Sequence, residues 1–531
     1  MTTDTSQTAS STSPQRSAEG TQSEPQVDPQ QLVRSWLNGR ARLTADGSVQ
    51  FAEVHASGRA EKLRRAYDWI ATRALLDPYH DMEFGTNTTT GLDTCRIQLP
   101  GSSGYASFVL MPLLNLVTNR RLVFVGGPGR GKTTMATLMA LLAGATLADV
   151  RKGVQHGHPQ LTLADLLGGP LPGDLVKAES AEAIHVRWRQ WITLRVKIID
   201  EYNRIPTKTQ SALLSLMAEG YAEQYEQAVE CGPGAWYLTA NDDQGGGTFQ
   251  VIEALKDRID AVVRCPPLHP GLIDTLADRV AGGATPEEFV PADLVCPPDE
   301  LDAAAKEVRA VHVSPAVRDL IGLFLGQLDF CRRASDRLEY QTKDTLHLAG
   351  KRVGHVCTED CPLDKSENLC TQTESGVSPR AAQALLHFSQ ALAYFRGRTE
   401  VGADDIRAVM PWVLHDKLPQ NPQSPFFQKP ENRVFLTDRV SWLWQLFDRA
   451  VAQQAAHAPT RKRTLELART CNAIPALATP DLGRRLHAVR ERMDEVVRET
   501  ELNAVTHSDL VLLKDLYVKC RNELDRRESG T

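Results

Sequence analysis

The stretch VFVGGPGRGKTT, residues 123–134, decides the fold class of this 531-residue chain. It joins a short apolar run to a glycine-rich turn, and a segment with a helical pattern follows. Gly126, Gly131, Lys132 and Thr133 fit the spacing GxxxxGK[ST], which is typical of a loop that binds phosphate groups. Because the strand before and the helix after supply the context that this motif requires, a tight turn before an ordinary core helix is the weaker interpretation.

The chemistry of the loop assigns a role to each kind of group in it. Backbone N–H groups at the start of a helix bind phosphate, Lys132 would reach the β and γ phosphates, and the Thr133 hydroxyl would ligate Mg²⁺. ATP and Mg²⁺ are therefore the expected cofactors. The predicted nucleotide-binding residues are Gly126, Gly127, Pro128, Gly129, Arg130, Gly131, Lys132, Thr133 and Thr134.

A second stretch, VKIIDE at residues 196–201, places two acids side by side at the end of an apolar run. Its β-branched residues predict a strand buried on both faces, and the carboxyl ends of such strands are where α/β sheets hold ligands. Buried carboxylates need a positive partner. We expect Asp200 to bind the Mg²⁺ ion, directly or through water, and Glu201 to polarise the attacking water. A solvated strand end is the alternative.

The pattern along the chain predicts an α/β domain followed by helices. From about residue 105 to 268, short apolar runs alternate with longer helical patterns, which is typical of a parallel sheet. The helix after the two acids is predicted to begin at a capping box formed by Thr207 and Gln210. The predicted organisation is a disordered tail at 1–28, a helical N-terminal extension at 29–104, the α/β nucleotide-binding domain at 105–269, an all-helical domain at 270–420 with a Cys-rich insertion at about 332–375, and a helical C-terminal region at 421–531.

Composition narrows the class of partner. The chain is 42% hydrophobic and 24% charged, with a net charge of -6, as is usual for a globular protein. Its one compact basic cluster is Arg461, Lys462 and Arg463, so nucleic acid is not an expected partner. The first residues lack the apolar segment of a signal peptide, and the longest apolar stretch, near Met135, is too short to span a bilayer. We therefore expect a cytoplasmic protein without a membrane span.

Four longer segments resemble the MoxR family of AAA+ ATPases, and together they cover about residues 105–418. They are QHGHPQLTLADLLGG (155–169), DEYNRIPTKTQSALLSLMAEG (200–220), GTFQVIEALKDRID (247–260) and VSPRAAQALLHFSQALAYFRGRTEVGADDIRAVMPWVLHDKL (377–418). Tyr202 stands where an aliphatic residue is more usual. The resemblance implies an AAA+ P-loop domain with a parallel sheet, and it identifies the following helices as the lid.

The resemblance also implies three further catalytic residues beside Lys132 and Glu201. Asn241 matches the sensor that helps to orient the lytic water, and its alternative is a turn residue. Arg258 matches the arginine finger that completes a neighbouring subunit's site, and its alternative is a helix-surface arginine beside acids. Arg380 matches the lid sensor for the γ-phosphate, and its alternative is a helix-start arginine packing on acids.

The lid departs from the family by an insertion that contains HVCTEDCPLDKSENLC, residues 355–370. Thiolate and imidazole groups suit a tetrahedral Zn²⁺ ion, so a zinc site at His355, Cys357, Cys361 and Cys370 is one interpretation, in which His347 or Cys331 could substitute. Free cysteines in a surface insertion are the other. His156 and His158, which lie in a loop without nearby acids in sequence, are expected to face solvent or a partner.

These observations and the resemblance together predict an ATP hydrolase. The resemblance implies a ring, with a hexamer as the expected form, that remodels or activates a protein client, with a von Willebrand factor A domain protein as a separate partner. The alternative is an ATP-dependent switch or scaffold in which binding of the nucleotide, not turnover, controls assembly.

Overall fold

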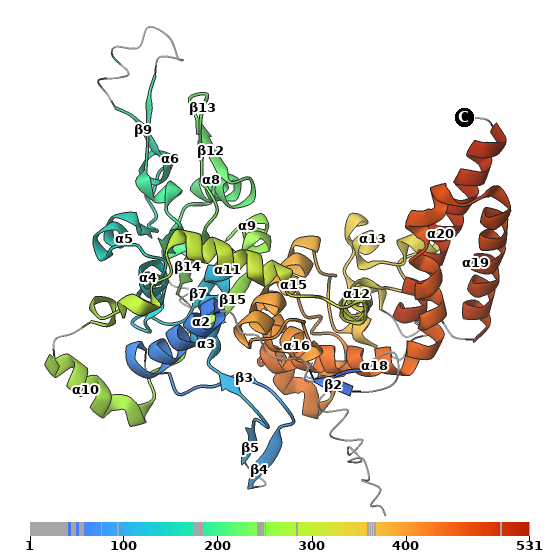
Figure 1. Ribbon diagram of the computed structural model, residues 1–531, viewed down its shortest axis with the longest axis horizontal. Helices are drawn as coiled ribbons and strands as arrows, with labels where there is room; N and C mark the ends of the chain where they lie inside the picture. Colours follow the sequence, from blue (N-terminus) through green and yellow to red (C-terminus); the bar gives the residue numbers. More distant parts are fainter. Residues whose placement is uncertain are drawn as a thin grey trace, which may run out of the picture.

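The computed structural model describes residues 41–43, 49–51 and 58–529, apart from 76, 93–94, 172, 174–175, 177–183, 242–248, 250, 283–284, 358–360, 362, 364, 366–367 and 500–501 (Figure 1). The predicted tail at 1–28 lies outside these residues. The chain runs from an N-terminal region through an α/β domain and a helical lid to a set of C-terminal helices.

The described part of the N-terminal region combines one helix with short strands. Helix α2 (Gly58–Trp69) continues into a π-helical turn, η1 (Ile70–Ala74), which agrees with the predicted helical pattern. The strands were not predicted. They are β1 (Ala41–Leu43) paired with β2 (Val49–Phe51), β3 (Met82–Glu83) paired with β6 (Gly104–Tyr105), and the hairpin β4 (Thr88–Leu92) and β5 (Cys95–Leu99).

A five-stranded parallel sheet forms the centre of the α/β domain, as predicted. Its strands, in the order in which they lie side by side, are β15 (Ala261–Arg264), β7 (Arg121–Val125), β14 (Ala235–Ala240), β11 (Val196–Asp200) and β8 (Gln155–His156). Numbered along the chain, this order is 5-1-4-3-2. The chain therefore winds in opposite directions on the two sides of β7, and such a reversal opens a crevice at the carboxyl ends of the strands.

Both faces of the sheet are covered. The helices of this domain are α3 (Ser107–Thr118), α4 (Lys132–Leu142), α5 (Leu147–Gly153), α6 (Leu163–Leu167), α8 (Thr207–Ala218) and α9 (Glu253–Arg258). Successive strand residues point to opposite faces. Ile198 accordingly belongs to the core that contains α3 and α4, whereas Ile199 belongs to the core that contains α8 and α9.

Two antiparallel pairs extend from this domain on the same side of the molecule, at the upper left of Figure 1. They are β9 (Gly168–Pro170) with β10 (Val186–Trp188), and β12 (Tyr221–Gln224) with β13 (Gln227–Glu230).

The capping box predicted at the start of α8 is wrong. Pro206 is the N-cap of α8, and Gln210 instead donates to the Ile205 carbonyl and accepts from the Ile252 amide.

The lid and the C-terminal region are helical, as predicted. The lid contains α10 (Ile273–Gly282), α11 (Pro298–Ala310), α12 (Pro315–Asp329), α13 (Lys343–Leu348), α14 (Val353–Val356), α15 (Pro379–Phe395) and α16 (Ala403–Leu414). The C-terminal helices are α17 (Pro425–Gln428), α18 (Arg439–Ala468), α19 (Thr479–Glu499) and α20 (Ala504–Ser529). Helix α15 packs on α3 of the α/β domain, and α18 packs on α12 and α16.

The C-terminal helices enclose a core of their own, and α18 connects it to the lid (Figure 1). Arg461, from the basic cluster, is buried in this region, where its guanidinium lies 3.2 Å from the Asp509 carboxylate. One member of the basic cluster therefore adds nothing to a positive surface. Among the described residues, no helix has both the length and the hydropathy needed to cross a bilayer.

Trp442 anchors α18 on the lid, and its removal should loosen the C-terminal region. The indole is fully buried and its N–H donates to Gln372 Oε1 at 3.0 Å. We expect Trp442→Ala to lower the free energy of unfolding by about 3–5 kcal/mol, because it removes a large buried ring and leaves a cavity. Urea unfolding followed by circular dichroism would measure this change. Val434→Ala, at a position that is 56% exposed, is the control; equal effects of the two variants would contradict the prediction.

Candidate active site

The phosphate-binding loop has the geometry that its sequence predicts. Strand β7 ends at Val125, and α4 begins at Lys132. Gly129 and Gly131 have φ angles of 71° and 76°, a left-handed conformation that glycine adopts without strain. The loop can therefore turn tightly and direct its backbone N–H groups at one point in front of the helix.

The Lys132 side chain is buried against the phosphate-binding loop. Its ammonium donates to the carbonyl oxygens of Gly126 and Gly127, at 2.5 and 2.8 Å, and to Asn241 Oδ1 at 2.7 Å. Asn241 follows the last residue of β14, the strand beside β7. The structure thus brings the predicted lysine and the predicted sensor into direct contact.

The Asp200 carboxylate joins three neighbouring strands. Its Oδ1 accepts hydrogen bonds from the hydroxyls of Thr133, at 2.9 Å, and Thr239, at 2.6 Å. Its Oδ2 lies 3.3 Å from Nδ1 of His156, at the end of β8. The two predicted Mg²⁺ ligands, Thr133 and Asp200, therefore lie together.

Glu201 lies beside this cluster with both carboxylate oxygens engaged. Oε1 accepts from Asn241 Nδ2 at 2.7 Å, and Oε2 accepts from Arg204 Nη1 at 2.8 Å. Its φ angle is 53°, and a left-handed conformation is costly for a residue other than glycine. The bond from the Glu201 amide to Thr239 Oγ1, at 2.9 Å, helps to hold the residue in this conformation.

The residues present fit Mg-ATP. Hydroxyl and carboxylate oxygens, as in Thr133 and Asp200, are the ligands that Mg²⁺ prefers, and Lys132 supplies a positive charge in front of the loop. A cavity of about 410 Å³ adjoins the loop at Gly126 and Arg130. This volume is within the usual range for small-molecule sites. Its other lining residues include Asp77, Tyr79, Asp81, Phe108 and Arg264.

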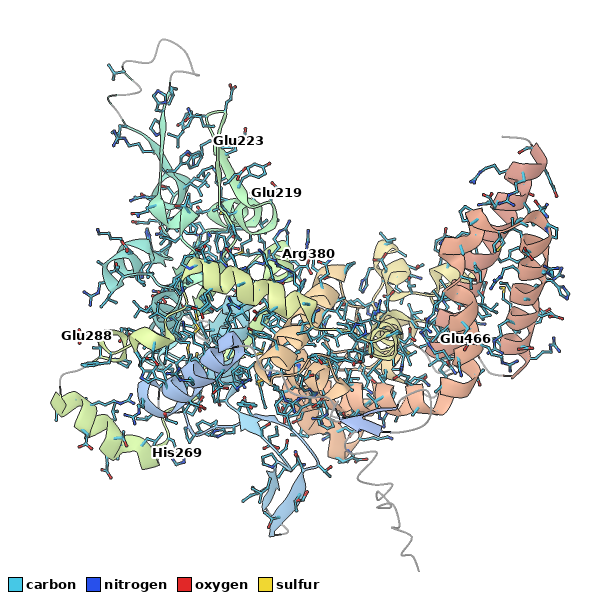
Figure 2. The ribbon with its side chains drawn as sticks, viewed as in Figure 1. Glu219, Glu223, His269, Glu288, Arg380 and Glu466 are labelled. Atoms are coloured by element: carbon cyan, nitrogen blue, oxygen red, sulfur yellow. The ribbon has the colours of Figure 1, made fainter. Side chains whose placement is uncertain are left out.

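The two predicted arginines lie outside this cluster. Arg258 is the last residue of α9, and its Nη1 donates to the Ala254 carbonyl of the same helix at 2.9 Å. Arg380, labelled in Figure 2, is near the start of α15, and its Nη1 donates to Asp257 Oδ2 at 3.0 Å. In this structure Arg380 therefore packs on an acid, which is the alternative that its sequence position left open.

The structure does not support the predicted zinc site at His355, Cys357, Cys361 and Cys370. In the part of the chain that it describes, no three His, Cys, Asp or Glu side chains are grouped so that they could hold a metal ion. His355 is exposed on α14, whereas burial raises the pKa of the Cys370 thiol to about 12 although the Lys343 ammonium opposes the shift. In the described part of the chain, these four side chains therefore do not form a group that could hold a zinc ion.

Three polar residues of the site were not predicted from the sequence. Thr239 lies two residues before Asn241, so strand alternation places both on the same face and could have identified it. Arg204 stands three residues after Glu201, in a 3₁₀ turn that sequence periodicity does not reveal. His156 was expected to face solvent or a partner; it is exposed but lies beside Asp200 because β8 pairs with β11.

Known proteins and family models resemble parts of this chain. Residues 121–260 match the model of the "ATPase family associated with various cellular activities (AAA)", and residues 366–435 match that of the "AAA lid domain". The uncharacterized protein YeaC of Bacillus subtilis is 23% identical over 325 residues, which are 61% of this chain and 85% of YeaC. A crystal structure of a candidate ATPase from Cytophaga hutchinsonii, 17% identical, covers 72% of this chain and 94% of its own, with a TM-score of 0.47.

The phosphate-binding loop, the acids at the end of β11 and the matched lid define an AAA ATPase, an enzyme class that hydrolyses ATP with Mg²⁺. Within that class the chain is similar to the MoxR type. It is 24% identical to protein MoxR of Paracoccus denitrificans over 335 residues, which are 59% of this chain and 84% of MoxR, so the homology is distant.

Two variants should separate binding of ATP from its hydrolysis. Glu201→Gln should keep ATP binding and lower turnover by about 10²–10⁴, because it removes the group proposed to act as general base. Lys132→Ala should weaken binding itself, because it removes a charge that faces the phosphates. A steady-state ATPase assay beside a nucleotide-binding assay distinguishes them. Undiminished turnover of the Gln variant would remove Glu201 from the proposed role.

Thr239 should be required for full activity, because its hydroxyl donates to Asp200 Oδ1 and accepts from the Glu201 backbone amide. Thr239→Val has nearly the same shape but leaves the Glu201 amide without its acceptor, and an unpaired buried donor costs about 1–3 kcal/mol. We expect turnover to fall and the Mg²⁺ concentration for half-maximal activity to rise, while Thr239→Ser restores both. Equal activity of the Val and Ser variants would contradict this role.

Proposed function

We propose that this ATPase assembles into a ring, with a hexamer as the expected form, and uses ATP hydrolysis to remodel or activate a protein client. The predicted partner with a von Willebrand factor A domain would be a separate chain. The location of Arg258 carries the proposal. Lys132, Thr133, Asp200, Glu201 and Asn241 meet within one chain, whereas Arg258 lies on α9 outside that cluster.

An arginine finger places its positive charge where negative charge develops on the transferring phosphoryl group. Such arginines raise the rate of hydrolysis by about 10³–10⁵ in related sites. Arg258 and Arg380 both lie outside their own chain's cluster, and the resemblance distinguishes them by matching Arg258 to a finger for a neighbouring subunit and Arg380 to the lid sensor. We propose this role for Arg258, and we assign Arg380 to the γ-phosphate of its own subunit. In the second candidate function, a nucleotide-dependent switch, the site would need no finger from a neighbour.

Mixing two inactive chains tests the shared site. An Arg258→Ala chain keeps Lys132, Asp200 and Glu201, while a Glu201→Gln chain keeps its finger. We expect the mixture to recover part of the activity at mixed interfaces, and the wild-type turnover per chain to rise with protein concentration as subunits assemble. A mixture that stays inactive, together with wild-type turnover per chain that is flat over a wide concentration range, would favour the switch.

A further inference from the structure

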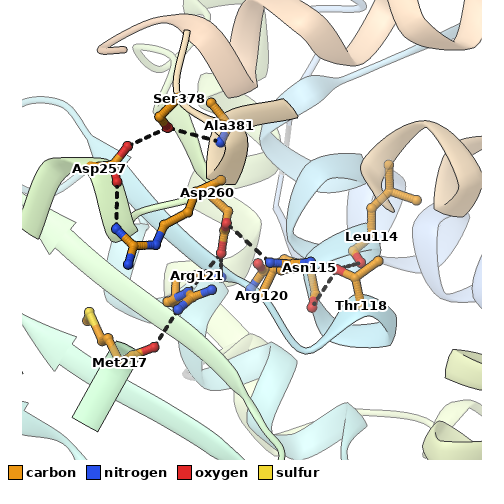
Figure 3. Close-up of polar contacts among 11 residues, drawn as sticks. Leu114, Asn115, Thr118, Arg120, Arg121, Met217, Asp257, Asp260, Ser378 and Ala381 are labelled. Atoms are coloured by element: carbon orange, nitrogen blue, oxygen red, sulfur yellow. Dashed lines mark hydrogen bonds and ion pairs between the residues drawn. The ribbon is translucent and has the colours of Figure 1, made fainter. Parts of the chain in front are cut away.

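Asp257 connects the helix that carries Arg258 to the lid. It precedes Arg258 on α9, and lid residues engage both of its carboxylate oxygens (Figure 3). Oδ2 accepts from Arg380 Nη1 at 3.0 Å, and Oδ1 accepts from the Ser378 hydroxyl at 2.7 Å. Ser378 is also the N-cap of α15, where its hydroxyl accepts from the Ala381 amide. The start of the lid helix is thus bonded to one side chain of α9.

On the other side of Arg258, Asp260 ties the same segment to the sheet. Its Oδ2 accepts from the Arg121 amide at 3.0 Å and from the Arg121 guanidinium at 2.8 Å, and the carboxylate is buried (Figure 3). Arg121 begins β7, the strand that leads into the phosphate-binding loop. Arg258 therefore stands between a buried attachment to the sheet and a second attachment to the lid.

The attachment to the lid is the more exchangeable of the two. The Arg380 side chain is 55% exposed and the Asp257 side chain 31%, whereas Asp260 is 3% exposed. Arg380 has five N–H donors, and Asp257 accepts from one of its nitrogens, so the same guanidinium can also bond a phosphate oxygen. Lys417, three residues beyond the lid helix α16, adds a buried ammonium group near both aspartates.

The charges around Asp257 keep its carboxyl ionised. Burial works to raise its pKa, but the hydrogen bonds from Ser378 and Arg380 and the charge of Lys417 outweigh it, and the pKa lies below its usual value. The carboxylate therefore presents a full negative charge to Arg380 at neutral pH, and the bond between them is charge-assisted.

We propose that Asp257 is a positioning residue that couples Arg380 of the lid to Arg258, so that the nucleotide in a subunit's own site sets the finger that this subunit offers its neighbour. The inference rests on the proposed function. When Arg380 bonds a phosphate, its hold on Asp257 changes, and Asp257 is the residue directly before the finger. Coupling between neighbouring sites would pass through this one carboxylate.

The mixing assay can measure this coupling if the finger donor is varied. The acceptor is the Arg258→Ala chain, and the donors are Glu201→Gln alone or combined with Asp257→Asn. We expect the combined donor to restore at least about tenfold less activity, because small displacements of a catalytic group cost factors of this size or more. The Asp257→Asn chain with Glu201 intact should bind ATP at least as tightly as the wild type, because Lys132 and the loop are unchanged and Arg380 no longer has a competing carboxylate.

Asp448→Asn in the Glu201→Gln donor is the matched control. Asp448 forms a comparable exposed ion pair with Arg407, at 2.7 Å, far in sequence from α9. This control donor should restore as much activity as Glu201→Gln alone. A donor with Asp257→Glu should recover part of the activity that Asp257→Asn loses. A donor with Asp257→Asn that rescues as well as its parent would overturn the proposal, and so would parallel losses of rescue and ATP binding, which indicate general damage at the junction.

Two possible failures, a misfolded Asp257 variant and a parent donor that does not rescue, have separate interpretations. If Asp257→Asn does not fold, Arg380→Gln in the Glu201→Gln donor breaks the same link from its exposed end, and full rescue by that donor would overturn the proposal. If the unmodified Glu201→Gln donor fails to rescue Arg258→Ala, the shared finger itself is wrong and this inference falls with it. That failure appears before any Asp257 variant is used, so the two failures are distinguishable.

Discussion

The hydrogen bonds to the Asp200 carboxylate are the interaction on which the site depends. One oxygen is shared by Thr133, at the start of α4, and Thr239, near the end of β14, and the other lies beside His156 of β8. Parallel strands bring these residues to the same edge of the sheet, because all their carboxyl ends meet there. Without that edge, three residues that are each at least 39 positions from Asp200 in sequence would not converge on its carboxylate.

The parts of the structure that could be predicted are those that depend on local sequence. The loop at 126–131 and the strand before Asp200 carry their own signals, since glycine spacing and β-branched runs restrict the backbone directly. The contacts between Lys132, Asn241 and Glu201 depend on the strand order, which local pattern does not specify. Thr207 and Gln210 had the spacing of a capping box, but Gln210 instead bonds the start of α9, a partner 42 residues away.

The zinc prediction and the alternative for Arg380 both show that sequence spacing does not specify contacts between distant parts of the chain. Cys357, Cys361 and Cys370 are close in sequence, yet whether thiols can bind a metal depends on burial and on neighbours such as Lys343, which sequence spacing does not specify. Arg380 pairs with Asp257, which is 123 residues away. Local pattern predicts that an acid could pair with Arg380, but only the packing of the lid on α9 identifies that acid as Asp257.

The length of α18 has a mechanical consequence. The helix has 30 residues, so at 1.5 Å per residue it is about 45 Å long. One end packs on the lid through α12 and α16, and the other end packs on α20. If the lid rotated by about 5° and carried the helix with it, the far end of a rod about 45 Å long would move by about 4 Å. The C-terminal helices would move with the lid, because the pair between Arg469 and Asp319 of α12 attaches this far end to the lid as well.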